Sequence, residues 1–197
     1  FLGKPFNGNI NKYIYQLDAL LEYKGDDPRN FLEVGAGYGG FCELVSQNFD
    51  FKNYFIIDLP ETLAVSSCYL SQFSSLNVFL IEDKDDLSKI PSTEKRVILI
   101  PANLYEELKL ENFPIDFFIN SNSFAEIGSH FVNGYLDFFI KWSSDQSYFL
   151  SFNQVGRKEI HDGEETTYSL DWASKILNGS VSKRSVRAES ELGIIEF

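Results

Sequence analysis

The sequence has few of the residues on which disulfide, metal and thiol chemistry depend. Among its 197 residues are two cysteines, two histidines and no methionine. Cys42 and Cys68 lie in segments with a helical pattern and form no CxxC or Cys/His motif, which predicts free thiols in a reducing cytoplasm. Because the chain begins at Phe1 and contains no Met, we expect a trimmed or partial sequence with something missing upstream.

Basic residues and long apolar runs are also scarce. The 17 Lys and Arg residues against 29 Asp and Glu give a net charge of −12. This balance argues against a nucleic acid partner, because a polyanion is bound by clustered basic side chains. No apolar run reaches the roughly 18 residues of a membrane span, and no secretion leader opens the chain. We therefore expect a soluble, cytoplasmic protein without membrane insertion.

Apolar and aromatic residues are plentiful, with 44% hydrophobic content, 19 Phe and 10 Tyr. A chain of this length can bury one sizeable core, so we expect a single domain over residues 1–197. Residues 1–30 form its helical lead-in. Apolar residues at helical spacing predict a helix over residues 9–23: Ile10, Ile14, Leu17, Leu20 and Leu21.

Short apolar runs alternate with helical patterns through the rest of the chain. The runs at 31–34, 53–58, 97–100, 116–120 and 148–152 predict buried strands. Alternation of this kind predicts a parallel sheet with helices on both faces, a three-layer α/β fold.

Three segments complete this prediction. Residues 129–142 carry Phe131, Tyr135, Phe138 and Phe139 on one helical face. Residues 181–186 and 192–197 are separated by a polar turn and predict an antiparallel strand pair at the end of the sheet. The segment 77–81 fits either a strand of the main sheet or an edge excursion and is left unassigned.

The stretch FLEVGAGYGG, residues 31–40, runs from a strand into a glycine-rich turn and a helix. Such a turn lets backbone approach a ligand closely. Two ligands fit: a dinucleotide, for which Gly35 to Gly40 match GxGxxG, and S-adenosylmethionine (SAM). Asp58 follows by one helix and one strand, where it could accept hydrogen bonds from a ribose diol in either case.

Glu33 favours SAM over the dinucleotide. A carboxylate two residues before the first glycine would repel a pyrophosphate, whereas SAM has no phosphate and carries an ammonium group and a sulfonium. With Gly35, Gly37 and Gly39 it gives the spacing ExGxGxG, which resembles motif I of class I SAM-dependent methyltransferases. This predicts a Rossmann-like methyltransferase fold.

Two further stretches extend the resemblance. YFIIDLPETL at 54–63 and IDFFINSNSFAEIG at 115–128, together with FLEVGAGYGG, resemble elements of a sugar O-methyltransferase family encoded in bacterial surface-glycan gene clusters. The resemblance covers roughly residues 31–153. It implies SAM as cofactor and a hydroxyl of a sugar or glycan precursor as the methyl acceptor.

In open parallel sheets the ligand lies beyond the carboxyl ends of the strands, so the cofactor site is predicted in the loops found there. The predicted cofactor-binding residues are Glu33, Gly35, Ala36, Gly37, Tyr38, Gly39, Asp58, Leu59, Asn103, Asn120 and Ser121. Asn122 offers a further hydrogen bond to cofactor or sugar. Tyr38, Phe124 and Trp172 are candidates for stacking on adenine or a sugar face.

A sugar hydroxyl has a pKa far above neutrality, so a base that takes its proton should assist methyl transfer. His130, His161 and Glu126 are the candidates, the last because it belongs to the family-like SFAEI element. Asp162, Glu164 and Glu165 beside His161 could suggest a metal, but we interpret them as a solvated acidic loop and predict no metal site.

Two other functions are compatible with the sequence. A nicotinamide-dinucleotide oxidoreductase is supported by the literal GxGxxG and opposed by Glu33. A non-catalytic module with a SAM fold is supported by the lack of an evident catalytic base.

Overall fold

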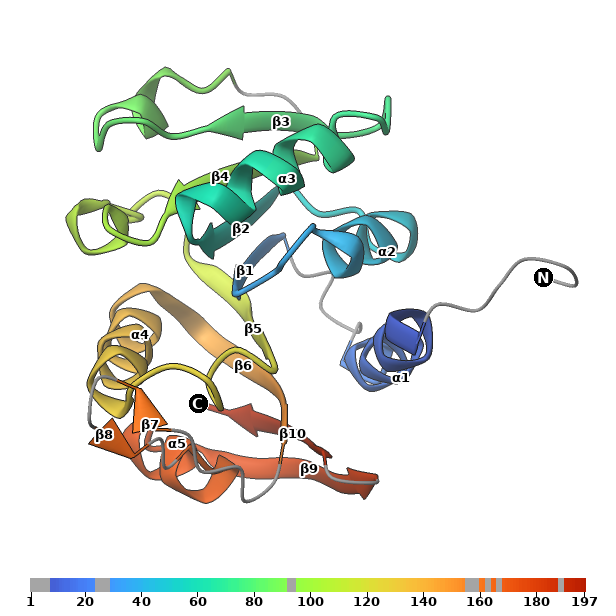
Figure 1. The fold of residues 1–197 in the computed structure, drawn as a ribbon, viewed down its shortest axis with the longest axis vertical. Coiled ribbons are helices and arrows are strands. Elements are labelled where there is room, and N and C mark those ends of the chain that lie inside the picture. Colours follow the sequence, from blue (N-terminus) through green and yellow to red (C-terminus); the bar gives the residue numbers. More distant parts are fainter. Residues whose placement is uncertain are drawn as a thin grey trace, which may run out of the picture.

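An eight-stranded twisted sheet in the order β3-β4-β2-β1-β5-β6-β10-β9 runs through the computed structural model (Figure 1). The structure describes residues 8–23, 29–91, 95–154, 160–161, 164–165, 168–187 and 190–197. The first six strands in that order are parallel, whereas β10 is antiparallel to both β6 and β9. The mostly parallel sheet with a C-terminal antiparallel pair, as predicted from the sequence, is confirmed.

The bounds of the main strands are β1 (Asn30–Val34), β2 (Asn53–Asp58), β3 (Asn77–Leu80), β4 (Arg96–Pro101), β5 (Ile115–Ser121), β6 (Ser143–Gln154), β9 (Ser180–Arg187) and β10 (Ser190–Glu196). The unassigned segment near residue 77 is thus an edge strand, paired with β4. A separate two-stranded ribbon joins β7 (Ile160–His161) to β8 (Glu164–Glu165).

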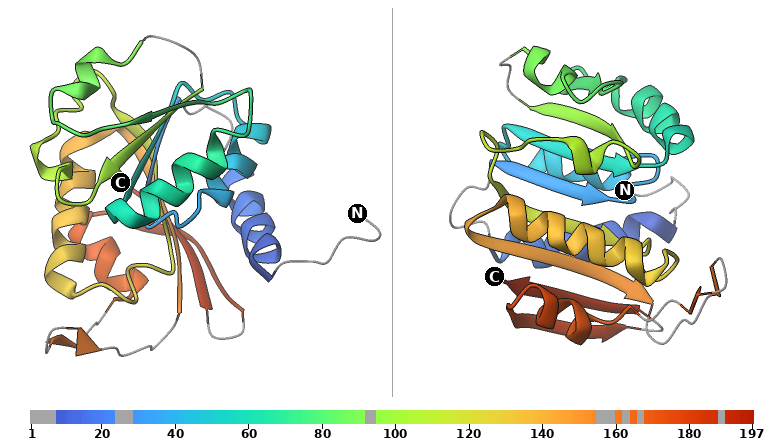
Figure 2. Two further views of the ribbon diagram at one scale, coloured as in Figure 1. Left: turned by 45° about the horizontal axis from the view of Figure 1, so that its top comes forward. Right: turned by 90° about the vertical axis from the view of Figure 1, so that its left-hand side faces the viewer.

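The helices are α1 (Gly8–Leu21), α2 (Gly40–Asn48), α3 (Pro60–Leu70), α4 (Ser129–Trp142) and α5 (Leu170–Ile176). The first three cover one face of the sheet and the last two the other, as Figures 1 and 2 show. Pro60 occupies the first turn of α3, where its missing N–H has no helical partner to lose. Short 3-10 helices follow β3 and β4, at Asp86–Lys89 and Tyr105–Glu107.

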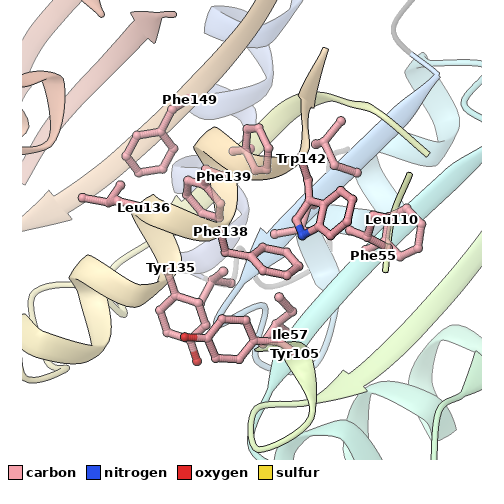
Figure 3. Close-up of a cluster of buried hydrophobic side chains, with 14 of the residues drawn as sticks. Phe55, Ile57, Tyr105, Leu110, Tyr135, Leu136, Phe138, Phe139, Trp142 and Phe149 are labelled. Atoms are coloured by element: carbon pink, nitrogen blue, oxygen red, sulfur yellow. The ribbon is translucent and has the colours of Figure 1, made fainter. Parts of the chain in front are cut away.

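Alternate residues along each strand enter two apolar layers. Leu32 of β1 faces the layer under α4, and Phe31 faces the layer under α2. Figure 3 shows the α4 layer, in which aromatic side chains of α4 pack toward Phe55 and Ile57 of β2. Phe124 belongs to this layer, fully buried and stacked on Phe139, so its ring serves the core.

Two helices match the predicted core face only in part: Leu17 and Leu20 of α1 and Tyr135, Phe138 and Phe139 of α4 are buried as predicted, but other predicted residues are exposed. In α1, Ile10 and Ile14 are 40% and 49% exposed, while Tyr13 and Gln16 are buried beside Leu17. The apolar stripe spans more than one side of the helix, so spacing alone does not fix which side turns inward. In α4 the prediction for Phe131 is likewise wrong: its side chain is 53% exposed.

Within the described ranges, no helix has both the length and the apolar content that crossing a membrane requires.

Candidate functional site

The candidate site lies at the carboxyl ends of the central strands, where the strand order reverses. β1 has β2 on one side and β5 on the other, and the chain crosses to opposite halves of the sheet from these two positions. In open α/β sheets, the crevice at such a reversal is where ligands bind. The loops after β1, β2, β4 and β5 meet at this edge (Figure 1).

The glycine turn after β1 depends on its glycines. Gly35, Gly37 and Gly39 have φ angles of 76°, 60° and 88°, in the left-handed region that favours glycine. A Cβ on Gly35 would come within 2.3 Å of Ser123 Oγ, and one on Gly39 within 2.8 Å of Leu70. A Cβ on Gly37 would meet no atom within 4 Å. Gly37 is therefore the position at which the turn leaves room for close approach.

Asp58, the last residue of β2, ties the turn to the neighbouring strand. Its Oδ2 accepts a hydrogen bond from the Gly37 N–H at 3.0 Å, and its Oδ1 accepts one from the Leu59 N–H at 2.8 Å. Burial raises the pKa of Asp58, while these two N–H groups and the Thr62 hydroxyl act to lower it. Three of the roughly four lone-pair positions of the carboxylate are therefore used, and Asp58 keeps one with which to accept a hydrogen bond from a ligand hydroxyl.

Glu33 is almost completely buried, at 1% exposure, on the face of β1 that looks toward α1 and α2. The Tyr54 hydroxyl donates a hydrogen bond to Glu33 Oε2 at 2.8 Å. Burial raises the pKa of Glu33 to about 7, against the hydrogen bond from Tyr54 and the nearby charge of Lys12, which both lower it. A buried carboxylate with this pKa has much to gain from a cationic ligand, because the cation stabilises its charged form.

The ring of Tyr38 fastens the turn to two helices. It lies edge-on to Tyr69 of α3 with centroids 5.0 Å apart, and 6.4 Å from Tyr13 of α1. The Ser66 hydroxyl of α3 donates to the Gly37 carbonyl oxygen at 2.6 Å. The Tyr38 side chain therefore holds the turn in place; a contact with the cofactor stays a prediction.

Asn120, near the end of β5, is the centre of a buried polar network. Its Nδ2 donates to the Val34 carbonyl oxygen at 2.9 Å and to Ser123 Oγ, and its Oδ1 accepts from Asn153 Nδ2 at 2.9 Å. The side chain is fully buried. These bonds give Asn120 a structural task, which is to hold the β5 loop against the end of β1.

Ser121 is also buried, and its Oγ accepts a hydrogen bond from Gln16 Nε2 of α1 at 2.9 Å. This bond joins two segments 105 residues apart and places α1 against the end of β5.

The other predicted cofactor residues line the same edge with different exposure. Leu59 presents an apolar side chain that is 60% exposed directly after Asp58. Asn103 is exposed in the turn after β4, and the neighbouring Ala102 N–H donates to the Asp58 carbonyl oxygen at 2.9 Å. Ala36 is buried inside the glycine turn. The structure thus brings these residues to the ends of β1, β2 and β4.

The candidate bases occupy two places. Glu126 is exposed in the segment between β5 and α4, and His130 is exposed in the first turn of α4, with its ring 3.9 Å from that of Phe131 between centroids. His161 is in β7, paired with Glu164, and its side chain lies outside the described residues. The stacking candidate Trp172 is on α5, and its ring is edge-on to that of Tyr168. Both rings pack against the apolar layer on the opposite face of the sheet from the glycine turn.

Among the described residues, no three His, Cys, Asp or Glu side chains are grouped so as to hold a metal ion. Asp162 lies outside the described residues. Both cysteine thiols are free, Cys42 buried and Cys68 exposed.

Three residues of the site were not among the sequence predictions: Tyr54, Ser123 and Gln16. Tyr54 could have been found, because strand alternation puts it on the same face as Ile56, which pairs with Glu33. Ser123 and Gln16 act through contacts with distant segments, and no local sequence pattern predicts such contacts.

No protein-family model matches the sequence, and no curated protein sequence is significantly similar to it. Solved structures do match. N-methyltransferase NodS from Bradyrhizobium japonicum WM9, in complex with S-adenosyl-L-homocysteine (SAH), aligns with a TM-score of 0.63 at 12% identity, covering 94% of this chain and 85% of that one. An S-adenosylmethionine-dependent methyltransferase from Clostridium acetobutylicum ATCC 824 aligns with 0.61 at 13%, covering 94% and 92%. The mitomycin 7-O-methyltransferase MmcR aligns with 0.63 at 11%, covering 93% and 52%.

The fold is therefore the Rossmann-like fold of class I SAM-dependent methyltransferases. These identities establish the architecture, and the function has to be argued from the site itself.

Proposed function

We propose that the protein is a SAM-dependent O-methyltransferase that transfers a methyl group to a hydroxyl of a sugar or glycan precursor. The observation that carries this proposal is the buried carboxylate of Glu33 beside the glycine turn, with Asp58 held at the end of the adjacent strand. The fold supports it, because solved structures of SAM-dependent methyltransferases share it over nearly the whole chain.

The residues present fit SAM group by group. The Glu33 carboxylate suits the ammonium of the methionine portion, and Asp58 retains a lone pair for a ribose hydroxyl. Gly37 leaves space over the turn, and the exposed apolar side chain of Leu59 suits one face of the adenine. When bound, SAM supplies an electrophilic methyl on its sulfonium.

The charge of Glu33 favours SAM over a dinucleotide as the ligand. A pyrophosphate near the turn would push Glu33 further toward its protonated form, which adds to the cost that burial already imposes. A cation at the same place relieves that cost. The nicotinamide alternative therefore loses support, although its GxGxxG pattern is present.

The acceptor is proposed from the resemblance of the β5 loop to sugar O-methyltransferases. That loop carries Glu126 and leads into α4, which has His130 in its first turn; both residues are exposed at the carboxyl edge and could take the proton of an acceptor hydroxyl. His161 remains a third candidate. MmcR, which shares the fold, is itself an O-methyltransferase.

An activity assay tests this proposal. Purified protein, tritiated SAM and a panel of free and nucleotide-linked hexoses should give labelled sugar from at least one member of the panel. Alanine at the residue that acts as base, among Glu126, His130 and His161, should lower kcat by about a hundredfold or more. If folded protein that binds SAH methylates no sugar but methylates an amine or a phenol, the sugar assignment is wrong.

A further inference from the structure

Gln16 is an unusual residue to find on the inward face of α1. Its neighbours on that face, Tyr13, Leu17 and Leu20, are all buried, and Gln16 itself is 0% exposed. Meanwhile Ile10 and Ile14 are left on the outer side of the same helix. Packing alone would favour the opposite arrangement, because a buried amide loses its water partners.

The amide of Gln16 is only half used inside the protein. Its Nε2 donates to Ser121 Oγ at 2.9 Å, but its Oε1 is buried with no hydrogen-bond partner among the described residues. An unpaired buried acceptor costs about 1–3 kcal/mol, and such groups in folded proteins call for an explanation.

A second unpaired acceptor lies one residue beyond Ser121. Asn122 Oδ1 is buried without a partner among the described residues, and Asn122 has a left-handed backbone with φ of 70°. Its N–H donates to the Phe152 carbonyl oxygen of β6 at 2.7 Å, which fixes the residue at the ends of β5 and β6. Strained backbone of this kind is concentrated at functional sites.

The chemistry of these two oxygens differs from that of Glu33. Both belong to neutral amides, so they match neutral donors and offer little to a cation compared with a carboxylate. Gln16 is bonded to Ser121 of β5 and Asn122 lies at the ends of β5 and β6, whereas Glu33 lies on β1 and Asp58 lies beyond it on β2. The methionine and ribose groups of the cofactor already have partners on those two strands.

We propose that the side-chain amides of Gln16 and Asn122 bind hydroxyl groups of the methyl acceptor, and that α1 thereby forms one wall of the acceptor site. This inference rests on the proposed function and deepens it, because it names the groups that recognise a polyhydroxylated acceptor. Each amide gains its missing hydrogen bond when the acceptor binds, so an acceptor lacking the matching hydroxyl is disfavoured.

The test uses two variants with matched controls. Gln16→Met keeps the side-chain length and removes the amide. Asn122→Gly removes the amide and keeps the positive φ. Gln47→Met, exposed on α2, and Asn178→Gly, which has φ of 50° in the turn before the edge strand β9, are the controls.

Three quantities are measured for each protein: SAH affinity by calorimetry, methyl transfer to the hexose that the wild type methylates best, and binding of that hexose to the SAH-saturated protein by saturation-transfer NMR. We expect kcat/KM to fall about tenfold or more in Gln16→Met and in Asn122→Gly, mainly through KM, with a matching loss of the NMR signal. SAH affinity should stay within about twofold of wild type, and the two controls should behave as wild type.

The possible failures are distinguishable. Unchanged kcat/KM and NMR signal in both variants would overturn this inference and leave the proposed function intact. Loss of SAH affinity in parallel with turnover would do the same, because it would assign the amides to the cofactor. A wild type that binds no SAH, or that methylates no hexose, would overturn the proposed function and this inference with it.

Discussion

At the scale of single residues, the charge state of Glu33 is the property with the clearest consequences. Burial raises its pKa to about 7, above the ordinary value of 4.5 for a glutamate side chain. Folding therefore favours the protonated form. The stability that this protonated carboxyl contributes is fully present below the unfolded pKa of about 4.5 and is lost as pH rises toward 7. Ionising Glu33 to bind a ligand therefore lowers the free energy of unfolding.

The first prediction concerns this cost. Relative to wild type, the unfolding free energy of Glu33→Gln should increase by about 3 kcal/mol between about pH 4.5 and about pH 8, because only wild type must ionise a buried carboxyl. Urea unfolding at a series of pH values measures this difference. A difference that stays constant with pH would show that Glu33 has an ordinary pKa.

The second prediction concerns the ligand. An ammonium beside Glu33 favours the carboxylate and lowers its pKa in the complex, so SAH affinity should be constant above about pH 7.5 and fall by up to about tenfold per unit below pH 7. Calorimetric titrations between about pH 5.5 and pH 8 test this. Glu33→Gln should bind SAH weakly, with little dependence on pH; an equal pH dependence in this variant would contradict the assignment.

At the scale of elements, the glycines of the turn after β1 differ in whether they serve the stability of the fold or the binding of a ligand. A Cβ at position 35 meets Ser123 Oγ at 2.3 Å, whereas one at position 37 meets nothing within 4 Å. Both positions have positive φ. Of these two glycines, Gly35 is required by the packing of the turn and Gly37 keeps a surface open.

Alanine substitutions should show this difference. Gly35→Ala should lower the unfolding free energy by about 3 kcal/mol through clash and strain, and Gly37→Ala by only about 1 kcal/mol through strain. SAH affinity should nevertheless fall in Gly37→Ala, since its methyl would project into the proposed ligand space. Thermal unfolding and calorimetry on both variants measure the two effects. Normal SAH affinity in a stable Gly37→Ala would move the ligand away from the turn.

The elements also show what the sequence could and could not predict. The sequence predicted that Glu33, the glycines and Asp58 lie together, because they belong to one strand-turn-helix-strand unit in which chain order fixes their spacing. The sequence did not predict Gln16 as part of the site, because its place there depends on a hydrogen bond to Ser121, 105 residues away. The inward face of α1 was predicted only in part for the same reason: the packing surface that selects it comes from distant strands.

At the scale of the whole molecule, the excess of acidic residues acts on stability. With 29 Asp and Glu against 17 Lys and Arg, the folded chain concentrates like charge. The ion pairs among the described residues are few, and each has at least one exposed partner, such as Lys84 with Glu107 at 3.7 Å; exposed pairs contribute little. Self-repulsion therefore opposes the compact state at neutral pH.

Salt should relieve this repulsion. Raising NaCl from about 20 mM to about 0.5 M shortens the screening length severalfold, so the melting temperature should rise by a few degrees. Differential scanning calorimetry measures this at neutral pH. A melting temperature that falls steadily with NaCl would mean that attractive charge pairs outweigh the repulsion.

The central claim is that a SAM-type ligand binds across the ends of β1 and β2, on Glu33, the glycine turn and Asp58. Isothermal titration with SAH tests it most directly, with Gly37→Arg as the comparison and NADH as the competing ligand. We predict one SAH site per chain in wild type, none in folded Gly37→Arg, and no binding of NADH. Absence of SAH binding to folded wild type, equal SAH affinity in Gly37→Arg, or tighter binding of NADH than of SAH would contradict it.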